Sequence, residues 1–225
     1  MRITIDGPSG AGKSTLSKKL AEKLDFKYID TGAMYRAIGL AVIKSFGKDY
    51  ESENISEAFY KNINVQVFYD GNEQKEFLDG VDITDKIRTP EVSMAASYVA
   101  KIPCVREKLV KIQREVAGRE NVIMDGRDAG TFVLPDAEIK LFLTAKAEDR
   151  AQRRYEELIA KGLDVNYEDV LNDVKKRDEN DSGRAISPLR PAEDAIMFDS
   201  SGNTFDETFN ELFELLSKKV EDVRV

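Results

Sequence analysis

Near its amino terminus the chain reads Gly7-Pro8-Ser9-Gly10-Ala11-Gly12-Lys13-Ser14. This octapeptide fits the phosphate-loop pattern, in which a glycine, four free positions and Gly-Lys-Ser or Gly-Lys-Thr follow one another. The apolar residues Ile3 and Ile5 predict a short strand before it, and leucines at helical spacing from Leu16 to Leu24 predict a helix after it. The strand and helix favour a working phosphate loop over the alternative, a glycine turn followed by an ordinary helix.

The glycines and the last two residues of the motif define its expected chemistry. Gly7, Gly10 and Gly12 permit positive φ and close backbone approach, so that N–H groups converge on phosphate oxygens at the positive end of the next helix. Lys13 can reach the outer phosphates of a nucleotide, and the Ser14 hydroxyl can ligate the accompanying Mg²⁺. The residues expected to bind a nucleoside triphosphate are Gly7, Pro8, Ser9, Gly10, Ala11, Gly12, Lys13, Ser14 and Thr15.

The composition restricts the class of protein. A length of 225 residues with 41% hydrophobic content predicts one domain over residues 1–225, and a net charge of −8 argues against a nucleic acid polymer as ligand. The chain has no histidine and a single cysteine, Cys104, which excludes a Ser-His-Asp triad, an intrachain disulfide and a cysteine zinc cluster. Residues 1–6 are too short and polar for a signal peptide, and the apolar run 37–43 is too short for a membrane span. We therefore expect a cytoplasmic protein that does not bind a membrane.

Strand and helix patterns alternate along the chain. Strands are expected at 27–29, 121–124, 139–143 and 195–198, and helices at 89–99, 105–116, 147–158, 167–176 and 204–220. This alternation predicts a three-layer α/β phosphate-loop core with a parallel sheet covered on both faces. Period-two patterns from residue 63 to 87 predict a small antiparallel β insert.

Three polar segments follow predicted strands or helices. Asp30-Thr31-Gly32 is expected to be a turn and 125–131 a dense polar loop, while 177–184 is a charged stretch without periodicity, for which a flexible surface turn is the alternative to a ligand-binding segment. Loops at the carboxyl ends of parallel strands face the ligand, and these offer arginines and carboxylates to a second, small anionic substrate. The Asn-Lys-x-Asp and Thr-Lys-x-Asp elements that read guanine in switch GTPases are absent from the sequence.

Many of these segments resemble the bacterial cytidylate kinases. The similarity includes Ile-Asp-Gly-Pro-Ser-Gly-Ala-Gly-Lys-Ser at 5–14, Asp-Thr-Gly-Ala-Met-Tyr-Arg at 30–36 and Asp-Gly-Arg-Asp-Ala-Gly-Thr at 125–131, and it runs in order from residue 2 to about 200. The resemblance implies a nucleoside monophosphate kinase that transfers the γ-phosphate of ATP to CMP or dCMP with Mg²⁺. It further implies a monophosphate-binding region at 31–120 and a lid at about 150–166. We expect the enzyme to be a monomer.

The resemblance also implies individual roles. Lys13, Arg127 and Arg184 would be catalytic, and Arg36, Arg127 and Arg184 would hold the acceptor phosphate. Thr31, Ser97, Arg106 and Asp128 would meet cytosine, Arg177 and Asp181 would meet the ribose, and Arg150 or Arg153 would cover the triphosphate.

Two questions stay open on the residues alone. Asp125, at the end of an apolar strand, is a candidate to position Mg²⁺ through water, and capping of the following loop is its alternative role. Two other functions compete with this one. The first is a phosphate-loop kinase for another small acceptor, such as shikimate or a different monophosphate, and the second is a nucleotide-sensing module that presents the β insert to a protein partner. The insert, Arg106 and Asp128 favour a cytidylate acceptor over the first rival. ATP turnover unaffected by any monophosphate would indicate the second.

Overall fold

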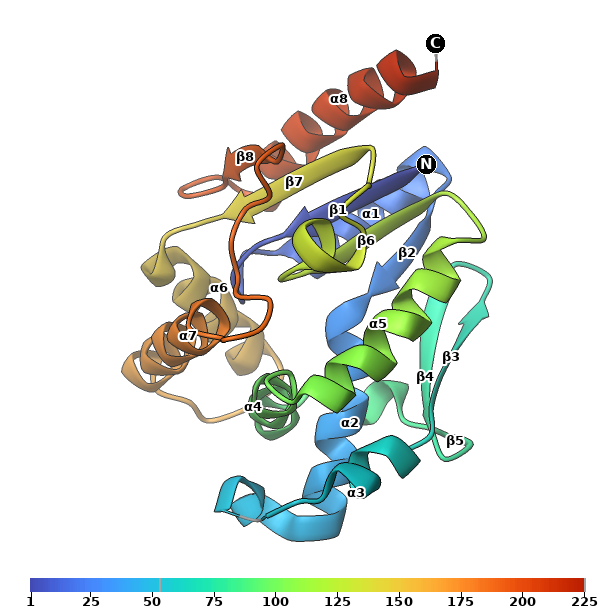
Figure 1. Ribbon diagram of the computed structural model, residues 1–225. Helices are drawn as coiled ribbons and strands as arrows, with labels where there is room; N and C mark the ends of the chain where they lie inside the picture. Colours follow the sequence, from blue (N-terminus) through green and yellow to red (C-terminus); the bar gives the residue numbers. More distant parts are fainter. Residues whose placement is uncertain (53, 225) are drawn as a thin grey trace. The chain divides into compact units, whose positions relative to one another are not determined.

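A computed structural model describes residues 1–52 and 54–224 (Figure 1). The chain forms two compact units, of which the first contains residues 1–27 and 121–225 and the second contains residues 28–120. Among the described residues, none of the helices is both long enough and apolar enough to cross a membrane.

The first unit is built on parallel strands. β1 (Arg2–Asp6) pairs with β6 (Val122–Gly126) on one side and with β7 (Ile139–Thr144) on the other, and β7 pairs with β8 (Ile196–Asp199). Nearly all side chains of β1, β6 and β7 are buried, as expected for strands that are covered on both faces. The mixed α/β class with a parallel sheet is therefore confirmed. The chain leaves this unit at β2 (Lys27–Asp30), whose first N–H donates to the Asn121 carbonyl at 2.8 Å.

Four long helices complete this unit: α1 (Lys13–Leu24), α6 (Ala147–Ala160), α7 (Tyr167–Ser182) and α8 (Phe205–Arg224). α6 and α7 pack through a small cluster of Ala151, Leu158, Val170, Leu171 and Val174. α8 begins with a capping box, in which Glu207 Oε2 accepts from the Thr204 N–H at 2.8 Å and Thr204 Oγ1 accepts from the Glu207 N–H at 3.3 Å. A π-helical turn (Ala129–Val133) follows β6.

The second unit combines helices with the antiparallel insert. Its elements are α2 (Thr31–Phe46), a 3₁₀ segment (Gly47–Ser52), α3 (Glu57–Asn62), β3 (Val65–Asp70), β4 (Glu73–Leu78), β5 (Val81–Asp82), a 3₁₀ turn (Thr84–Lys86), α4 (Pro90–Val99) and α5 (Pro103–Ala117). The β3–β4 hairpin pairs Val65 with Leu78 through to Asp70 with Glu73, and Gly71 in its turn has φ 59°. Gly39 lets α2 approach α4, since a Cβ there would lie 2.9 Å from the Ala96 nitrogen. The predicted antiparallel sheet is thus present.

Three predicted boundaries are wrong, for identifiable reasons. Residues 177–182 continue α7 instead of forming a turn, because tertiary ion pairs of Asp178 and Asp181 replace the apolar stripe that the sequence lacks. Thr31 opens α2 instead of lying in a turn, because the Asp30 side chain caps the helix by accepting from the Ala33 N–H at 2.8 Å. The predicted polar loop at 125–131 is shorter, since Asp125 and Gly126 belong to β6.

Candidate active site

The phosphate loop has the backbone geometry that its glycines predict. Gly12, which precedes α1, has φ 83°, a left-handed conformation that side chains disfavour. Gly7 has φ 152°, and a Cβ there would lie 1.9 Å from the Leu143 carbonyl oxygen. The loop therefore fits against β7 only with glycine at position 7, and it leads directly into the amino terminus of α1, where anions are stabilised.

Lys13 is buried inside this loop. Its Nζ donates to the Pro8 carbonyl at 2.7 Å, and only 5% of the residue is exposed. Burial, followed by the charge of Arg127, lowers the pKa of Lys13 well below its usual range, while Asp125, Asp181 and Asp6 oppose this shift. A bound phosphate would supply the negative charge that keeps this ammonium protonated.

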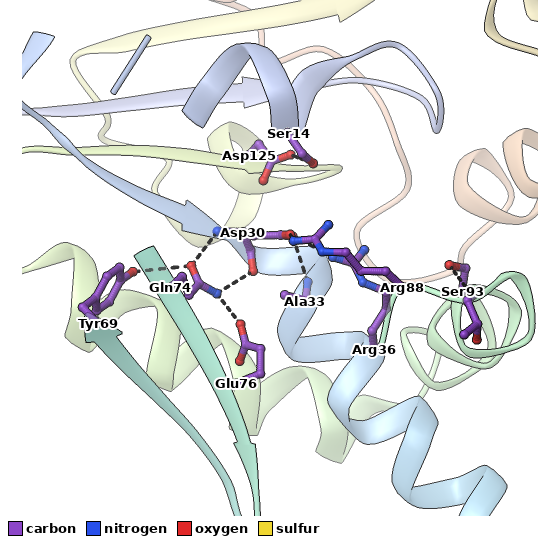
Figure 2. Close-up of polar contacts among 11 residues, drawn as sticks. Ser14, Asp30, Ala33, Arg36, Tyr69, Gln74, Glu76, Arg88, Ser93 and Asp125 are labelled. Atoms are coloured by element: carbon purple, nitrogen blue, oxygen red, sulfur yellow. Dashed lines mark hydrogen bonds and ion pairs between the residues drawn. The ribbon is translucent and has the colours of Figure 1, made fainter. Parts of the chain in front are cut away.

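Ser14 and Asp125 lie side by side in the first unit. Ser14 Oγ donates to Asp125 Oδ2 at 2.8 Å (Figure 2). In the part of the chain that the structure describes, no group of three or more His, Cys, Asp or Glu residues could hold a metal by itself. Mg²⁺ binds oxygen ligands and is commonly held by one or two protein groups together with waters and substrate phosphates. The hydroxyl and the carboxylate fit such an ion.

Asp181 holds together two arginines that were predicted to bind the acceptor phosphate. Arg127 Nε donates to Asp181 Oδ2 at 2.7 Å, and Arg184 donates to the other carboxylate oxygen. Burial alone would raise the pKa of Asp181, but Arg127 and Arg184 hold it below its ordinary value. Arg177, the other predicted ribose ligand, also lowers the pKa of Asp181 through its charge. The carboxylate is therefore ionised and holds both guanidinium groups in fixed directions.

Asp6 supports the neighbouring turn that carries Asp128. Its two carboxylate oxygens accept from the N–H groups of Ala129 at 2.8 Å and Gly130 at 2.7 Å. Burial raises the pKa of Asp6 to about 7, although these two bonds oppose the shift. Asp128 itself is 6% exposed. Sequence reasoning missed the role of Asp6, whose only signal is a carboxylate at the end of β1 immediately before the loop.

The two lid candidates, Arg150 and Arg153, contact different parts of the first unit. Arg150 is buried, donates to the Ser9 carbonyl of the phosphate loop at 2.9 Å and forms a two-bond ion pair with Asp178 at 3.0 and 2.6 Å. Arg153 instead donates to the carbonyl of Ser200 at 2.7 Å, in the turn after β8. Of the two, the structure brings Arg150 to the phosphate loop.

In the second unit, one carboxylate holds two arginines. Asp30 Oδ2 accepts from Arg36 at 2.8 Å and from Arg88 at 3.1 Å (Figure 2). Burial alone would raise the pKa of Asp30, but Arg36 and then Arg88 lower it below its ordinary value. Arg88 was not among the predicted site residues. Its signal is its place in the segment Ile87-Arg88-Thr89, just before α4.

Three residues of the second unit that were predicted to contact cytosine are buried. Arg106, on α5, is 2% exposed and donates to the Tyr35 hydroxyl at 3.3 Å. Ser97, on α4, is 6% exposed, and its Oγ has no hydrogen-bond partner among the described residues. Thr31 is the buried first residue of α2. A buried hydroxyl without a protein partner is costly, and a ligand could supply the missing bond.

The loop, its lysine and the parallel sheet define a phosphate-loop kinase fold. A gluconokinase from Sinorhizobium meliloti shares the fold with a TM-score of 0.51 at 15% identity, over 99% of this chain and 95% of that one. An uncharacterised protein from Eubacterium ventriosum does so with a TM-score of 0.53 at 14% identity, over 96% and 98% of the two chains. These similarities concern the fold alone.

The family is shown by sequence. The family model for cytidylate kinase matches residues 3–218. A cytidylate kinase from Caldicellulosiruptor saccharolyticus is 54% identical over 220 residues, which cover 98% of this chain and 97% of that protein. One from Bacillus subtilis is 45% identical over 219 residues, covering 97% of each. The chain belongs to the cytidylate kinase family, and the predicted resemblance is confirmed.

Proposed function

We infer that this chain is an ATP-dependent nucleoside monophosphate kinase that phosphorylates CMP. The observation that carries the inference is the match to cytidylate kinases over nearly the whole chain, at 54% identity to one relative, combined with a buried lysine inside a phosphate loop. A kinase for an unrelated acceptor and a nucleotide-sensing module are not favoured by these relatives. We propose dCMP as a second acceptor.

In the proposed reaction the chain acts by alignment and charge. The transition state of phosphoryl transfer carries negative charge that positioned cations stabilise, so a protein base is not required. Lys13 would contact the transferred phosphoryl group, and the loop from Gly7 to Thr15 would hold the triphosphate, with Arg150 steadying the loop at Ser9. This assignment agrees with a chain that has no histidine.

Mg²⁺ is proposed at Ser14 and Asp125. The ion would supply charge neutralisation between the phosphates of the donor. The Asp125 carboxylate orients the serine hydroxyl, since Ser14 Oγ donates its only proton to Asp125 and therefore presents its lone pairs elsewhere.

The acceptor is proposed to bind through three groups of residues. Arg36, Arg127 and Arg184 would hold its phosphate, and Arg177 and Asp181 its ribose. Thr31, Ser97, Arg106 and Asp128 would read the base, where the unpartnered Ser97 hydroxyl supports a ligand contact.

A panel of acceptors tests the proposal. With MgATP, we expect rapid ADP formation with CMP and dCMP, slower formation with UMP and none with AMP, GMP or shikimate. Turnover that no monophosphate accelerates would contradict a kinase and favour the sensing module. We also propose that the protein is a cytoplasmic monomer. Light scattering of the purified chain should then give a mass close to 25.3 kDa.

A further inference from the structure

A single glutamine of the β insert binds the peptide that carries Asp30. Gln74 lies on β4, and its Oε1 accepts from the Asp30 N–H at 2.8 Å while its Nε2 donates to the Asp30 carbonyl at 3.1 Å (Figure 2). The orientation of this amide is set by chemistry, because a backbone N–H can only donate and a carbonyl can only accept. The side chain thus pairs with the last residue of β2 as a neighbouring strand would.

Two further groups hold the Gln74 amide in this direction. The Tyr69 hydroxyl shares its proton between two acceptors, the Tyr28 carbonyl at 3.1 Å and Gln74 Oε1 at 3.5 Å. On the other side, Gln74 Nε2 donates to Glu76 Oε1. Glu76 is 1% exposed, and it lies two residues along β4, on the same face of the strand. The insert therefore presents a preorganised amide rather than a mobile surface glutamine.

The held peptide determines where two guanidinium groups lie. Asp30 ends β2 and caps α2, with φ −86° and ψ 94°, so the direction of its carboxylate follows from the orientation of its backbone. That carboxylate holds Arg36 and Arg88 on one oxygen, at 2.8 and 3.1 Å. A displacement of the Asp30 peptide would move both arginines together. Misplacement of a substrate-binding group by about 1 Å can cost on the order of 100-fold in rate.

We propose that Gln74 is a positioning residue for the acceptor phosphate, and that the β insert acts in the reaction by holding the Asp30 peptide and, through it, Arg36 and Arg88. This inference rests on the proposed function, since it assumes that Arg36 binds the phosphate of CMP. It gives the β insert a role in substrate binding, whereas the alternative is an insertion without a function in the reaction.

The test compares the substrate affinities of the Gln74→Met variant with those of the wild-type protein (the unchanged chain). Methionine keeps the length and volume of the side chain and removes both bonds to Asp30. Without these bonds the Asp30 peptide and its two arginines lose their fixed position, so we expect the KM for CMP to rise about tenfold with the KM for ATP unchanged. The binding constant for cytidine, which has no phosphate, should stay within about twofold of the unchanged chain.

The readouts separate positioning from a loss of folded protein. A merely structural defect would lower kcat by reducing the fraction of active enzyme, and it would weaken the binding of CMP and of cytidine equally. That result would overturn the proposal. An unchanged KM for CMP in a folded Gln74→Met protein would overturn it as well. Gln66→Ala is the matched control, because Gln66 is an exposed glutamine on the neighbouring strand β3, and its constants should not change.

A second variant and a prior activity measurement complete the test. If Gln74→Met does not fold, Tyr69→Phe removes the hydroxyl that bonds both Gln74 Oε1 and the Tyr28 carbonyl, and a two- to threefold rise in the KM for CMP is expected. No rise would contradict the inference. Failure of the unchanged chain to phosphorylate CMP would instead contradict the proposed function, and this is measured first.

Discussion

Arg127 Nε and Asp181 Oδ2 lie 2.7 Å apart, although the two residues are 54 positions apart in the sequence. The pair joins the end of β6 to the end of α7 within the first unit, and Arg184 occupies the other oxygen of the same carboxylate. A buried carboxylate that accepts from two arginines fixes the directions of both guanidinium groups. We propose that this arrangement serves the acceptor phosphate.

Arg184→Ala should therefore raise the KM for CMP and lower kcat together. The guanidinium is proposed to bind the acceptor phosphate and to neutralise charge during transfer. We therefore expect the KM for CMP to rise and kcat to fall, each by about tenfold or more. The exposed Arg190 lies six positions further along the chain, and Arg190→Ala is the control. Steady-state kinetics with both variants decide the matter, and equal constants for the two would remove Arg184 from the site.

Lys13→Ala should abolish transfer while the protein remains folded. The substitution removes the cation that is proposed to contact the outer phosphates, and we expect kcat to fall on the order of 100-fold or more. Lys18→Ala changes an exposed lysine on the same helix and should leave kcat unchanged. Circular dichroism confirms the fold of both variants. If Lys13→Ala retained more than about a tenth of the original kcat, the lysine would not be catalytic.

Glu76→Gln should change the pH dependence of stability. Burial raises the pKa of Glu76 from 4.5 to about 7, with Asp30 adding to the shift and Gln74, Arg36 and Arg88 opposing it. The folded protein therefore keeps the proton that the unfolded chain releases, so this group favours folding below pH 4.5 and loses that contribution as pH rises to about 7.

The measurement is urea unfolding of both proteins at pH 5 and pH 8. Glutamine does not titrate and can still accept from Gln74. The free energy of unfolding of the variant, relative to that of the wild-type protein, should therefore increase by up to about 3 kcal/mol between pH 5 and pH 8. The comparison cancels Asp6, which titrates in both proteins. A pH-independent difference would show that Glu76 has an ordinary pKa.

The phosphate loop and the β insert could be predicted because each depends on local sequence. Glycine spacing fixes the loop, and alternation with a turn at Asp70-Gly71 fixes the hairpin. The last turns of α7 could not be predicted in this way, since Asp178 and Asp181 are stabilised by Arg150 and Arg127 from other elements.

The missed site residues depend on the same kind of distant contact. Asp6 and Gln74 act through backbone groups more than 40 positions away, and hydrogen bonds of this kind leave no periodic pattern in the sequence.

Asp128 should decide between cytosine and uracil. Cytosine has an exocyclic N4 amino group that donates hydrogen bonds, whereas uracil has an acceptor oxygen at the same position. An ionised carboxylate accepts from the first and repels the second. A hydrogen bond with a charged partner contributes about 1.5–3 kcal/mol, so Asp128→Ala should lower kcat/KM for CMP by about 10- to 150-fold.

For UMP the same substitution should lower kcat/KM much less, or raise it, because the repulsion disappears with the carboxylate. If Asp128 only stiffens the turn beside Arg127, both substrates should suffer equally. Asp136→Ala, which removes an exposed carboxylate that pairs with Arg2, controls for the change in net charge. The ratio of kcat/KM for CMP to that for UMP is therefore the quantity to measure, and a ratio equal in Asp128→Ala and the unchanged chain would exclude base reading by Asp128.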